Sequence, residues 1–214
     1  GVSILSSAGD EFSIEDYTQV VREFEAPRSH AKHSVLSTGS TYMTGSLARL
    51  KLHGHLLTGQ AAWARDLLFP NGVPDNVLWN TRAQAVELMH CVEHGIELVD
   101  RLLASRGEST APAPYELRAG RGVAAVEVPR GILFHEYVVN AEGRVEHANV
   151  ITPTAQNLAN IEGDLRAATE LLLPAGASDK ELEASLEMVA RAYDPCISCS
   201  VHVTRARGAR EAPA

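Results

Sequence analysis

The sequence is poor in cysteine and has no long apolar stretch. Only three of its 214 residues are cysteine, which is too few, and an odd number, for a disulfide framework. The first residues, GVSILSSAGDEFS, lack the basic start and the apolar segment of a signal peptide. No apolar run approaches the roughly 20 residues that cross a bilayer. We therefore expect a cytoplasmic protein without a membrane segment, in which a CxxC pair is more often a metal or redox site than a disulfide.

Positive charge is also scarce. Lys and Arg number 19 against 27 Asp and Glu, which gives a formal net charge of -8. Because phosphate binding needs a basic surface, this balance argues against nucleic acid as a partner. Apolar residues, by contrast, are abundant: 45% of the chain is hydrophobic, which is enough for a sizeable core.

Apolar periodicity predicts a mostly helical chain with one small sheet. Spacings of three and four residues, with capping and breaking residues at the boundaries, predict helical segments at 13–24, 47–69, 76–104, 156–173 and 179–193. Three segments rich in β-branched and aromatic residues follow residue 120, and NAEG between two of them is typical of a hairpin turn. We expect a mainly α, α+β fold: a long-helix bundle with a small antiparallel β insertion around 121–152. Residues 25–46 are predicted to be irregular, with His30, Lys32 and His33 in a solvated loop.

The segment RAYDPCISCSVH near the C-terminus is the strongest indication of chemistry. Cys196, Cys199 and His202 are spaced three apart, so on a helical turn they lie on roughly one side. Thiolates are soft ligands that suit zinc, iron–sulfur clusters and nickel. A structural zinc site needs four ligands and would have to recruit one from HCVEH at 90–94. For Cys91 in that segment, the simpler interpretation is a small core residue.

The context of the cysteine pair is more specific than the pair itself. The segment around it closely resembles DPCxxCxxH, the C-terminal signature of the large subunit of [NiFe] hydrogenases. Three further segments resemble that family's Y-x-V-G-P-L-A-R, A-P-R-G and P-S/T-x-x-N segments in the same order: YMTGSLARLKL (42–52), VPRGILFHEY (128–137) and ITPTAQN (151–157). The departures from the pattern are Thr44, Ser46 and Val128. The C-terminal segment is most similar to the soluble, cytoplasmic, cofactor-coupled type.

The resemblance implies a nickel–iron centre whose iron carries carbon monoxide and cyanide. It makes Cys196 a terminal nickel ligand and Cys199 a bridge between nickel and iron. A terminal thiolate keeps lone pairs free and can accept the proton when H2 is split, whereas a bridging thiolate is less basic because two cations share it. The implied activity is the reversible heterolytic cleavage of H2 by an oxidoreductase subunit, with its metal site at the C-terminal end of the fold.

The same resemblance implies roles for residues around the open metal position. Buried cyanide ligands are anionic acceptors that need donors. Arg130 matches the family's arginine over the metals, which donates to a cyanide or acts as a base; the base role is unusual, because guanidinium groups hold their proton tightly. Thr154 matches the Ser or Thr that binds the other cyanide. Pro129 and Asp194 complete the canopy, with Asp194 paired to Arg130; alternatively, the Asp194–Pro195 step only ends the preceding helix.

A second metal ion is implied beside the first. His202 corresponds to the family's C-terminal histidine, which binds magnesium or a similar ion with help from a backbone carbonyl expected near Val150. His135 has two open interpretations: it forms a hydrogen bond near the cluster, or it packs within a strand.

The chain also departs from the family. The family's large subunits are longer and carry a second cysteine pair, R-x-C-G-x-C-x-x-x-H, that nothing here matches. We expect residues 1–202 to be the C-terminal portion of such a subunit. Residues 203–214 would be an extension that a maturation endopeptidase removes by cutting after His202. The implied partners are an iron–sulfur small subunit and flavin or other electron-transfer subunits, since three cysteines are too few to hold a further cluster.

Two other functions remain open from the sequence. The respiratory quinone-reducing complex contains a relative of this large subunit that has lost its metal cysteines and serves as a scaffold. The absent second cysteine pair fits such a protein, whereas the intact Cys196 and Cys199 argue against it. A zinc-stabilised binding domain fits the CxxC pair but does not account for PRG and PTAQN.

Overall fold

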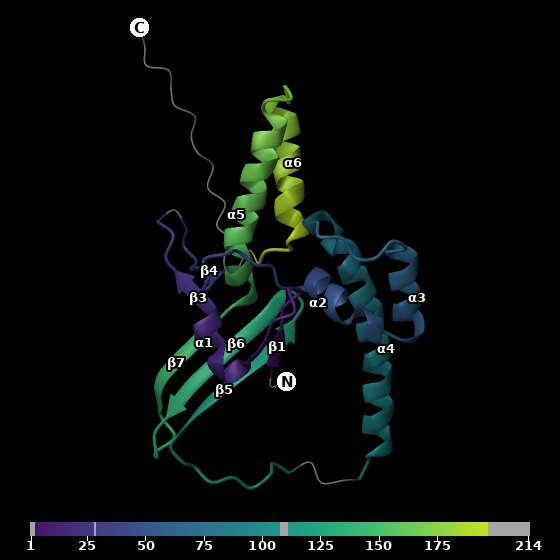
Figure 1. The fold of residues 1–214 in the computed structure, drawn as a ribbon. Coiled ribbons are helices and arrows are strands. Elements are labelled where there is room, and N and C mark those ends of the chain that lie inside the picture. Colours follow the sequence, from purple (N-terminus) through teal and green to yellow (C-terminus); the bar gives the residue numbers. More distant parts are fainter. Residues whose placement is uncertain (1–2, 28, 108–110, 197–214) are drawn as a thin grey trace, which may run out of the picture.

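The computed structural model describes residues 3–27, 29–107 and 111–196 (Figure 1). Its helices are α1 (Tyr17–Val20), α2 (Ser46–His53), α3 (Gly59–Leu68), α4 (Asn80–Ala104), α5 (Pro153–Leu172) and α6 (Asp179–Ala192), with short 3-10 turns η1 (Ile14–Asp16), η2 (Gly54–Leu56) and η3 (Val77–Trp79). Its strands are β1 (Ser3–Leu5), β2 (Glu11–Ser13), β3 (Val21–Phe24), β4 (His33–Leu36), β5 (Gly120–Val128), β6 (Gly131–Val139) and β7 (Val145–Ile151). Cys199, His202 and the extension 203–214 lie outside the described residues.

Strands β5, β6 and β7 form one antiparallel sheet in sequence order, as the sequence predicts. Val128 pairs with Gly131, so Pro129 and Arg130 form a two-residue turn between β5 and β6. Gly131 has a φ of 142°, a conformation that side chains bearing a Cβ rarely adopt. The geometry of this turn therefore depends on glycine.

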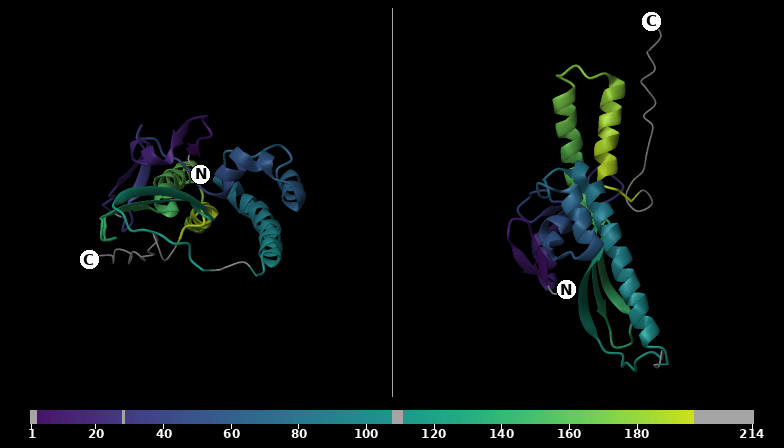
Figure 2. Two further views of the ribbon diagram at one scale, coloured as in Figure 1. Left: turned by 90° about the horizontal axis from the view of Figure 1, so that it is seen from below. Right: turned by 90° about the vertical axis from the view of Figure 1, so that its right-hand side faces the viewer.

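The helices form two groups rather than one continuous bundle. Helices α2 and α3 pack against α4, while α5 and α6 form an antiparallel pair that projects from one end of the molecule (Figure 2). The first group has a core of Leu47, Leu50, Ala64, Phe69, Ala83 and Val86. Buried Asn80 joins the two groups, because its Oδ1 accepts a hydrogen bond from Leu47 N (2.9 Å) and its Nδ2 donates to Ala192 O (2.8 Å).

A second apolar cluster lies between the N-terminal segment and the sheet. Tyr17 stacks on Phe134 with 4.9 Å between ring centroids, and Val21 and Ile151 complete the cluster. The Tyr17 hydroxyl donates to Glu136 Oε2 at 2.7 Å, so its polar atom is satisfied despite burial. This contact anchors the first part of the chain to the sheet.

Two short sheets near the N-terminus differ from the prediction. The segment predicted as a helix over 13–24 is helical only to Val20, and Val21–Phe24 is strand β3, paired antiparallel with β4. The region predicted as irregular contains β4, and His33, expected in a solvated loop, is buried in that strand. The reason is that β-branched residues in both segments gain from cross-strand pairing, which local periodicity does not report.

The later helices follow the prediction closely. Helix α4 begins after a 3-10 turn and runs to Ala104. Helix α6 begins with the expected capping box, in which the Ser178 and Glu181 side chains each bond the other's backbone N–H. Among the described residues, none of the helices combines the length and the apolarity that spanning a membrane would require.

Candidate metal centre

The predicted site residues meet where three segments approach one another: the β5–β6 turn, the start of α5 and the stretch after α6. Arg130 Nε donates to the backbone oxygen of Asp194 (2.6 Å), and Arg130 Nη2 lies 3.2 Å from Asp194 Oδ1. The backbone N–H of Cys196 donates to Thr154 Oγ1 at 3.3 Å. The fold thus brings together four residues that the sequence resemblance named from separate segments.

Asp194 occupies an unusual backbone conformation. Helix α6 ends at Ala192, and Asp194 has a φ of 50°, which Asp tolerates better than most residues. Its carboxylate accepts hydrogen bonds from Arg130 Nη2 and from Gln84 Nε2 of α4, the latter at 3.2 Å. The Asp194–Pro195 step therefore does more than end the helix: it turns the carboxylate toward the arginine and α4.

Thr154 is held in the first turn of α5. Pro153 stands at the start of that helix, where its missing N–H costs nothing. The Thr154 side chain is buried, with 3% of its surface exposed. Its hydroxyl oxygen accepts from Cys196 N, which leaves the hydroxyl proton available to donate.

Asn157 connects the β5–β6 turn to the segment before α2. Its Oδ1 accepts from Thr44 N (2.8 Å), and its Nδ2 donates to Thr44 O (3.1 Å) and Arg130 O (3.4 Å). Gly45 and Gly131 allow this close approach: a Cβ on Gly45 would lie 3.2 Å from Arg130 O, and one on Gly131 would collide with the Thr44 side chain. The turn is therefore packed tightly against two neighbouring segments.

Arg49 of α2 holds the other side of the same turn. Its guanidinium donates to Val128 O (2.9 Å) and Pro129 O (3.0 Å), and it pairs with both carboxylate oxygens of Glu87 at 2.6 and 2.8 Å. Burial lowers the pKa of Arg49. The hydrogen bonds and negative charge of Glu87, and then of Glu127, together raise this pKa by more than burial lowers it, so its net shift is upward. Arg49 is therefore a permanently charged support for the turn.

The sequence reasoning assigned no role to these supporting side chains. Arg49 and Asn157 both lie inside segments that carried the family resemblance, and that was the available signal. Gln84 and Asn80 gave no such signal, because their contacts join positions 110 to 112 residues apart.

Three predicted positions stand apart from this cluster. Pro129 is exposed at the turn, and Val150 lies in β7, 40% exposed and paired with His135. His135 Nδ1 is 2.9 Å from Tyr137 Oη, which favours packing within the strand. Because Cys199 and His202 lie outside the described residues, the second thiolate and the magnesium site stay predictions.

The HCVEH segment offers no zinc site in its observed surroundings. His90 and His94 stack with 6.0 Å between ring centroids on α4. The interpretation of Cys91 as a core residue is wrong, because its side chain is exposed on α4. In the part of the chain that the structure describes, no three or more His, Cys, Asp and Glu side chains gather in a group able to hold a metal ion.

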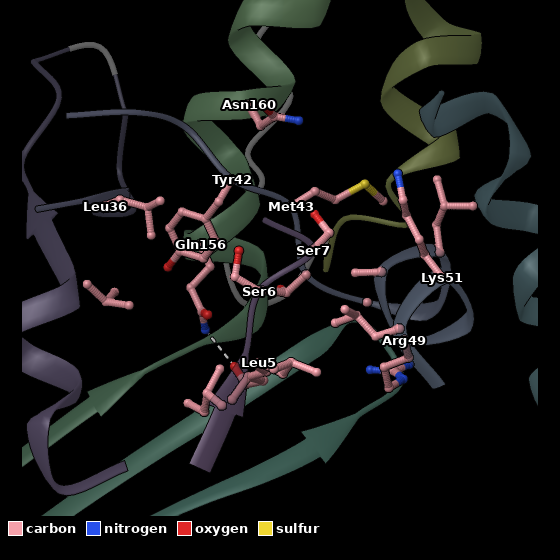
Figure 3. A pocket seen from close by; sticks show the side chains of 18 of the residues that line it. Leu5, Ser6, Ser7, Leu36, Tyr42, Met43, Arg49, Lys51, Gln156 and Asn160 are labelled. Atoms are coloured by element: carbon pink, nitrogen blue, oxygen red, sulfur yellow. Dashed lines mark hydrogen bonds between the residues drawn. The ribbon is translucent and has the colours of Figure 1, made fainter. Parts of the chain in front are cut away.

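A cavity of about 1290 Å³ lies on the other side of the turn (Figure 3). The N-terminal hairpin, α2, the β3–β4 sheet and α5 line it, and none of the predicted site residues does. Gln156 Nε2 donates to Ile132 O at 2.5 Å within this lining. The described residues that the sequence predicts for the metal centre therefore lie outside this cavity.

The donors at that cluster suit a nickel–iron group with diatomic ligands. Cys196, whose backbone N–H donates to the Thr154 hydroxyl, carries the soft sulfur that a nickel–iron group would need as a ligand. Arg130 uses Nε and Nη2 on Asp194, and among the described residues its Nη1 has no hydrogen-bond partner. A cysteine near a guanidinium and a hydroxyl supplies residue types that suit buried anionic ligands on a metal.

Comparison with known proteins places this arrangement in a family. A family model described as nickel-dependent hydrogenase matches residues 73–202. Sulfhydrogenase 1 subunit alpha of Pyrococcus furiosus is 40% identical over 209 residues, which make up 96% of this chain and 47% of that protein. NAD-reducing hydrogenase HoxS subunit beta of Cupriavidus necator is 29% identical over 90% of this chain and 41% of its own length. A crystal structure of NAD+-reducing [NiFe]-hydrogenase in the H2-reduced state is similar with a TM-score of 0.74 and 28% identity, over 94% of this chain and 46% of that one.

The chain belongs to the nickel-dependent hydrogenase family, which confirms the resemblance noted in the sequence. It spans about half the length of the relatives it matches.

Proposed function

We propose that this chain forms the C-terminal, metal-binding part of the catalytic subunit of a [NiFe] hydrogenase, which reversibly splits H2 into protons and electrons. The observation that carries the proposal is the meeting of Arg130 and Asp194 with Thr154 and the Cys196 peptide. Membership of the nickel-dependent family supports it, because these are the residues that match the family's segments.

In this proposal, the thiolates of Cys196 and Cys199 would hold the nickel–iron centre, Cys196 as a terminal ligand and Cys199 as a ligand shared by the two metals. When bound, the nickel–iron centre supplies the Lewis acidity that polarises H2 and the redox capacity that takes up its electrons. Arg130 and Thr154 each offer a donor to the cyanide ligands on iron. Carbon monoxide, a poor acceptor, needs no such partner.

The chain's own part in the reaction is to receive the proton and to keep the site dry and ordered. In the loaded site, the Cys196 thiolate would accept the proton released when H2 is split. Asp194 orients the Arg130 guanidinium, which stays a donor. Pro129, exposed in the same turn, would complete the wall of the site as the family resemblance implies. Orientation of fixed donors is the contribution that a protein makes most effectively to such a site.

The remaining proposals concern the assembly. His202, with the Val150 carbonyl, would hold magnesium or a similar ion beside the centre. Electrons would leave through an iron–sulfur small subunit and on to flavin or other electron-transfer subunits in the cytoplasm. Residues 203–214 would be the extension that a maturation endopeptidase removes from residues 1–202 once nickel is in place.

The decisive experiment is metal analysis and infrared spectroscopy of the matured enzyme, purified with its partner chains. We expect bound nickel, infrared bands of metal-bound carbon monoxide and cyanide, and H2-dependent reduction of a viologen dye. Cys196→Ser should abolish all three, whereas Cys91→Ser, at the exposed cysteine on α4, should change none of them.

The alternatives give different outcomes in the same experiment. A scaffold would contain no nickel and show no infrared bands. A zinc-stabilised domain would contain zinc and lose its fold with a chelator. Either result would contradict the proposed function.

A further inference from the structure

The β5–β6 turn has an unusual hydrogen-bonding pattern. In a two-residue hairpin the loop carbonyls normally face water. Here three consecutive backbone oxygens accept from side chains of other elements: Val128 O and Pro129 O from Arg49, and Arg130 O from Asn157. The Arg49 contacts join positions 79 and 80 residues apart, so the turn is held from outside the hairpin.

Arg49 is itself held in place before it reaches the turn. The Glu87 carboxylate of α4 forms a bidentate ion pair with Nε and Nη2 of Arg49. Glu127 Oε2 lies 2.7 Å from Arg49 Nη1. Ser46 of α2 donates to Glu87 and so orients the carboxylate. The Arg49 and Glu87 side chains are only 18% and 24% exposed, so solvent screens their pairing weakly. A planar five-donor fork is required to reach two carbonyls and two carboxylates at once.

We infer that Arg49 is a positioning residue: by gripping the carbonyls of Val128 and Pro129, it fixes the turn that presents the Arg130 guanidinium to the metal site. This inference rests on the proposed function. No hydrogen bond or ion pair joins the Arg49 side chain to Asp194 or Thr154, and its grip on the turn is through the two backbone oxygens that precede Arg130. Asp194 then orients the guanidinium at the end of the Arg130 side chain through two contacts.

The inference explains why the turn needs two anchors. Arg130 has a long side chain, and the side chains of Arg130 and Asp194 are 38% and 40% exposed. An ion pair this exposed restrains a guanidinium only weakly by itself. Holding the backbone of the β5–β6 turn limits where the Arg130 side chain can start from, and the ion pair with Asp194 then needs to orient only the side chain. Displacements of about 1 Å at a reacting group can lower a rate about 100-fold.

The test is Arg49→Lys in the matured enzyme with its partner chains. Lysine keeps the charge but cannot bond two carbonyls and a carboxylate pair together. We expect unchanged nickel content, an unchanged KM for H2, a kcat lowered about 10-fold to 100-fold, and cyanide infrared bands shifted in the same direction as in Arg130→Lys. In the metal-free chain, amide hydrogen exchange in peptides covering 126–134 should become faster.

The matched control is Arg65→Lys. Arg65 of α3 also bonds a backbone carbonyl, Gly54 O, and a carboxylate, Asp66, but it has no contact with the turn. It should leave kcat, the cyanide bands and the exchange of 126–134 as in the parent protein.

The inference is overturned if Arg49→Lys shows parental cyanide bands and parental exchange of 126–134. Should that variant fail to fold, Glu87→Gln removes the charge that orients Arg49 and leaves the guanidinium in place; it is expected to shift the bands in the same direction, and parental bands there would equally overturn the inference. Absence of nickel and of cyanide bands from the parent enzyme would contradict the proposed function instead.

Discussion

Single residues at the site act more by directing the backbone and its neighbours than by forming strong ion pairs. The Arg130–Asp194 pair is more than one-third exposed on both sides, so it contributes about 1 kcal/mol or less to stability. Asn157 is 3% exposed and makes three hydrogen bonds to two segments. Losing these buried hydrogen bonds would cost more stability than losing the Arg130–Asp194 ion pair. The ion pair is therefore best understood as a device for orientation.

The first residue-scale prediction concerns Arg130. Arg130→Lys keeps the charge but removes the Nε contact to Asp194 O and the free Nη1. Because a preorganised donor is lost, kcat for H2 oxidation should fall about 100-fold with nickel still bound. Dye reduction under H2 with nickel analysis measures this. The control is Arg191→Lys, in an exposed pair with Glu187 on α6, which should change neither. A parental rate in Arg130→Lys would refute the assigned role.

The second concerns Tyr17 and alkaline pH. Burial, then its hydrogen bond to Glu136, raises the pKa of Tyr17 from 10.0 to about 12. Because the unfolded chain releases this proton first, the stability that it contributes is complete below pH 10 and is lost as the pH rises toward 12. In urea unfolding of the purified chain, Tyr17→Phe should reduce the fall in free energy of unfolding over that range. Tyr115→Phe, at an exposed tyrosine, should keep the parental slope, and equal slopes in both variants would contradict the expectation.

At the scale of elements, the turn of the β5–β6 hairpin carries Arg130, one of the residues of the proposed site. Its two strands are paired regularly up to Val128 and Gly131, and the turn between them is the part that the rest of the protein holds. Helix α5 contributes at its first turn and α6 at its end, so the site is built from the termini of elements. At the ends of helices and strands, backbone groups and short side chains from different elements can approach one another.

The element-scale prediction is that Gly131→Ala destabilises the protein. A residue with φ of 142° is strained when it carries a Cβ, and that Cβ would collide with Thr44 and approach Pro153 Cβ to 3.2 Å. The free energy of unfolding should fall by about 1–3 kcal/mol or more, as measured by urea unfolding of the purified chain. Gly122→Ala in β5 has open space and an ordinary φ, and should be close to neutral. Equal stability of the two variants would show that the turn can relax.

At the scale of the whole molecule, α4 carries an uncovered apolar stripe. Its members recur at spacings of three and four residues and are 46–67% exposed: Leu88, Val92, Ile96, Val99 and Leu103. Only residues in the first turns of α4 are buried, against α2 and α3. Glu93 in its middle still binds the start of α3, and the C-terminal turns extend away from the other helices (Figure 2). Surfaces of this kind in soluble proteins are usually covered by another polypeptide.

We predict that the purified chain by itself associates through this stripe. The combined change Val92→Glu and Val99→Glu should lower both its apparent mass in sedimentation and its binding of a hydrophobic dye. The combined change Thr81→Glu and His90→Glu adds charge at other exposed positions of α4 and should have little effect. If both double variants associate and bind the dye equally, the stripe is not the cause.

Much of the architecture could be predicted from local patterns. The helical period gave the extent of α4, the Ser178–Glu181 box marked the start of α6, and β-branched runs around a turn predicted the three-stranded sheet. The same local patterns carried the family resemblance, because the site residues stand in short segments whose spacing is set along the chain.

The sequence by itself determined the elements with strong local signals and the residue types offered to the metal. Only the tertiary structure decided that Val21–Phe24 pairs as a strand, that Cys91 is exposed, and that Arg49 holds the turn before Arg130. The physical reason is that each of these depends on which remote segment lies alongside. Pairing, burial and side-chain support of a backbone are contacts between distant positions, and a local pattern does not encode them.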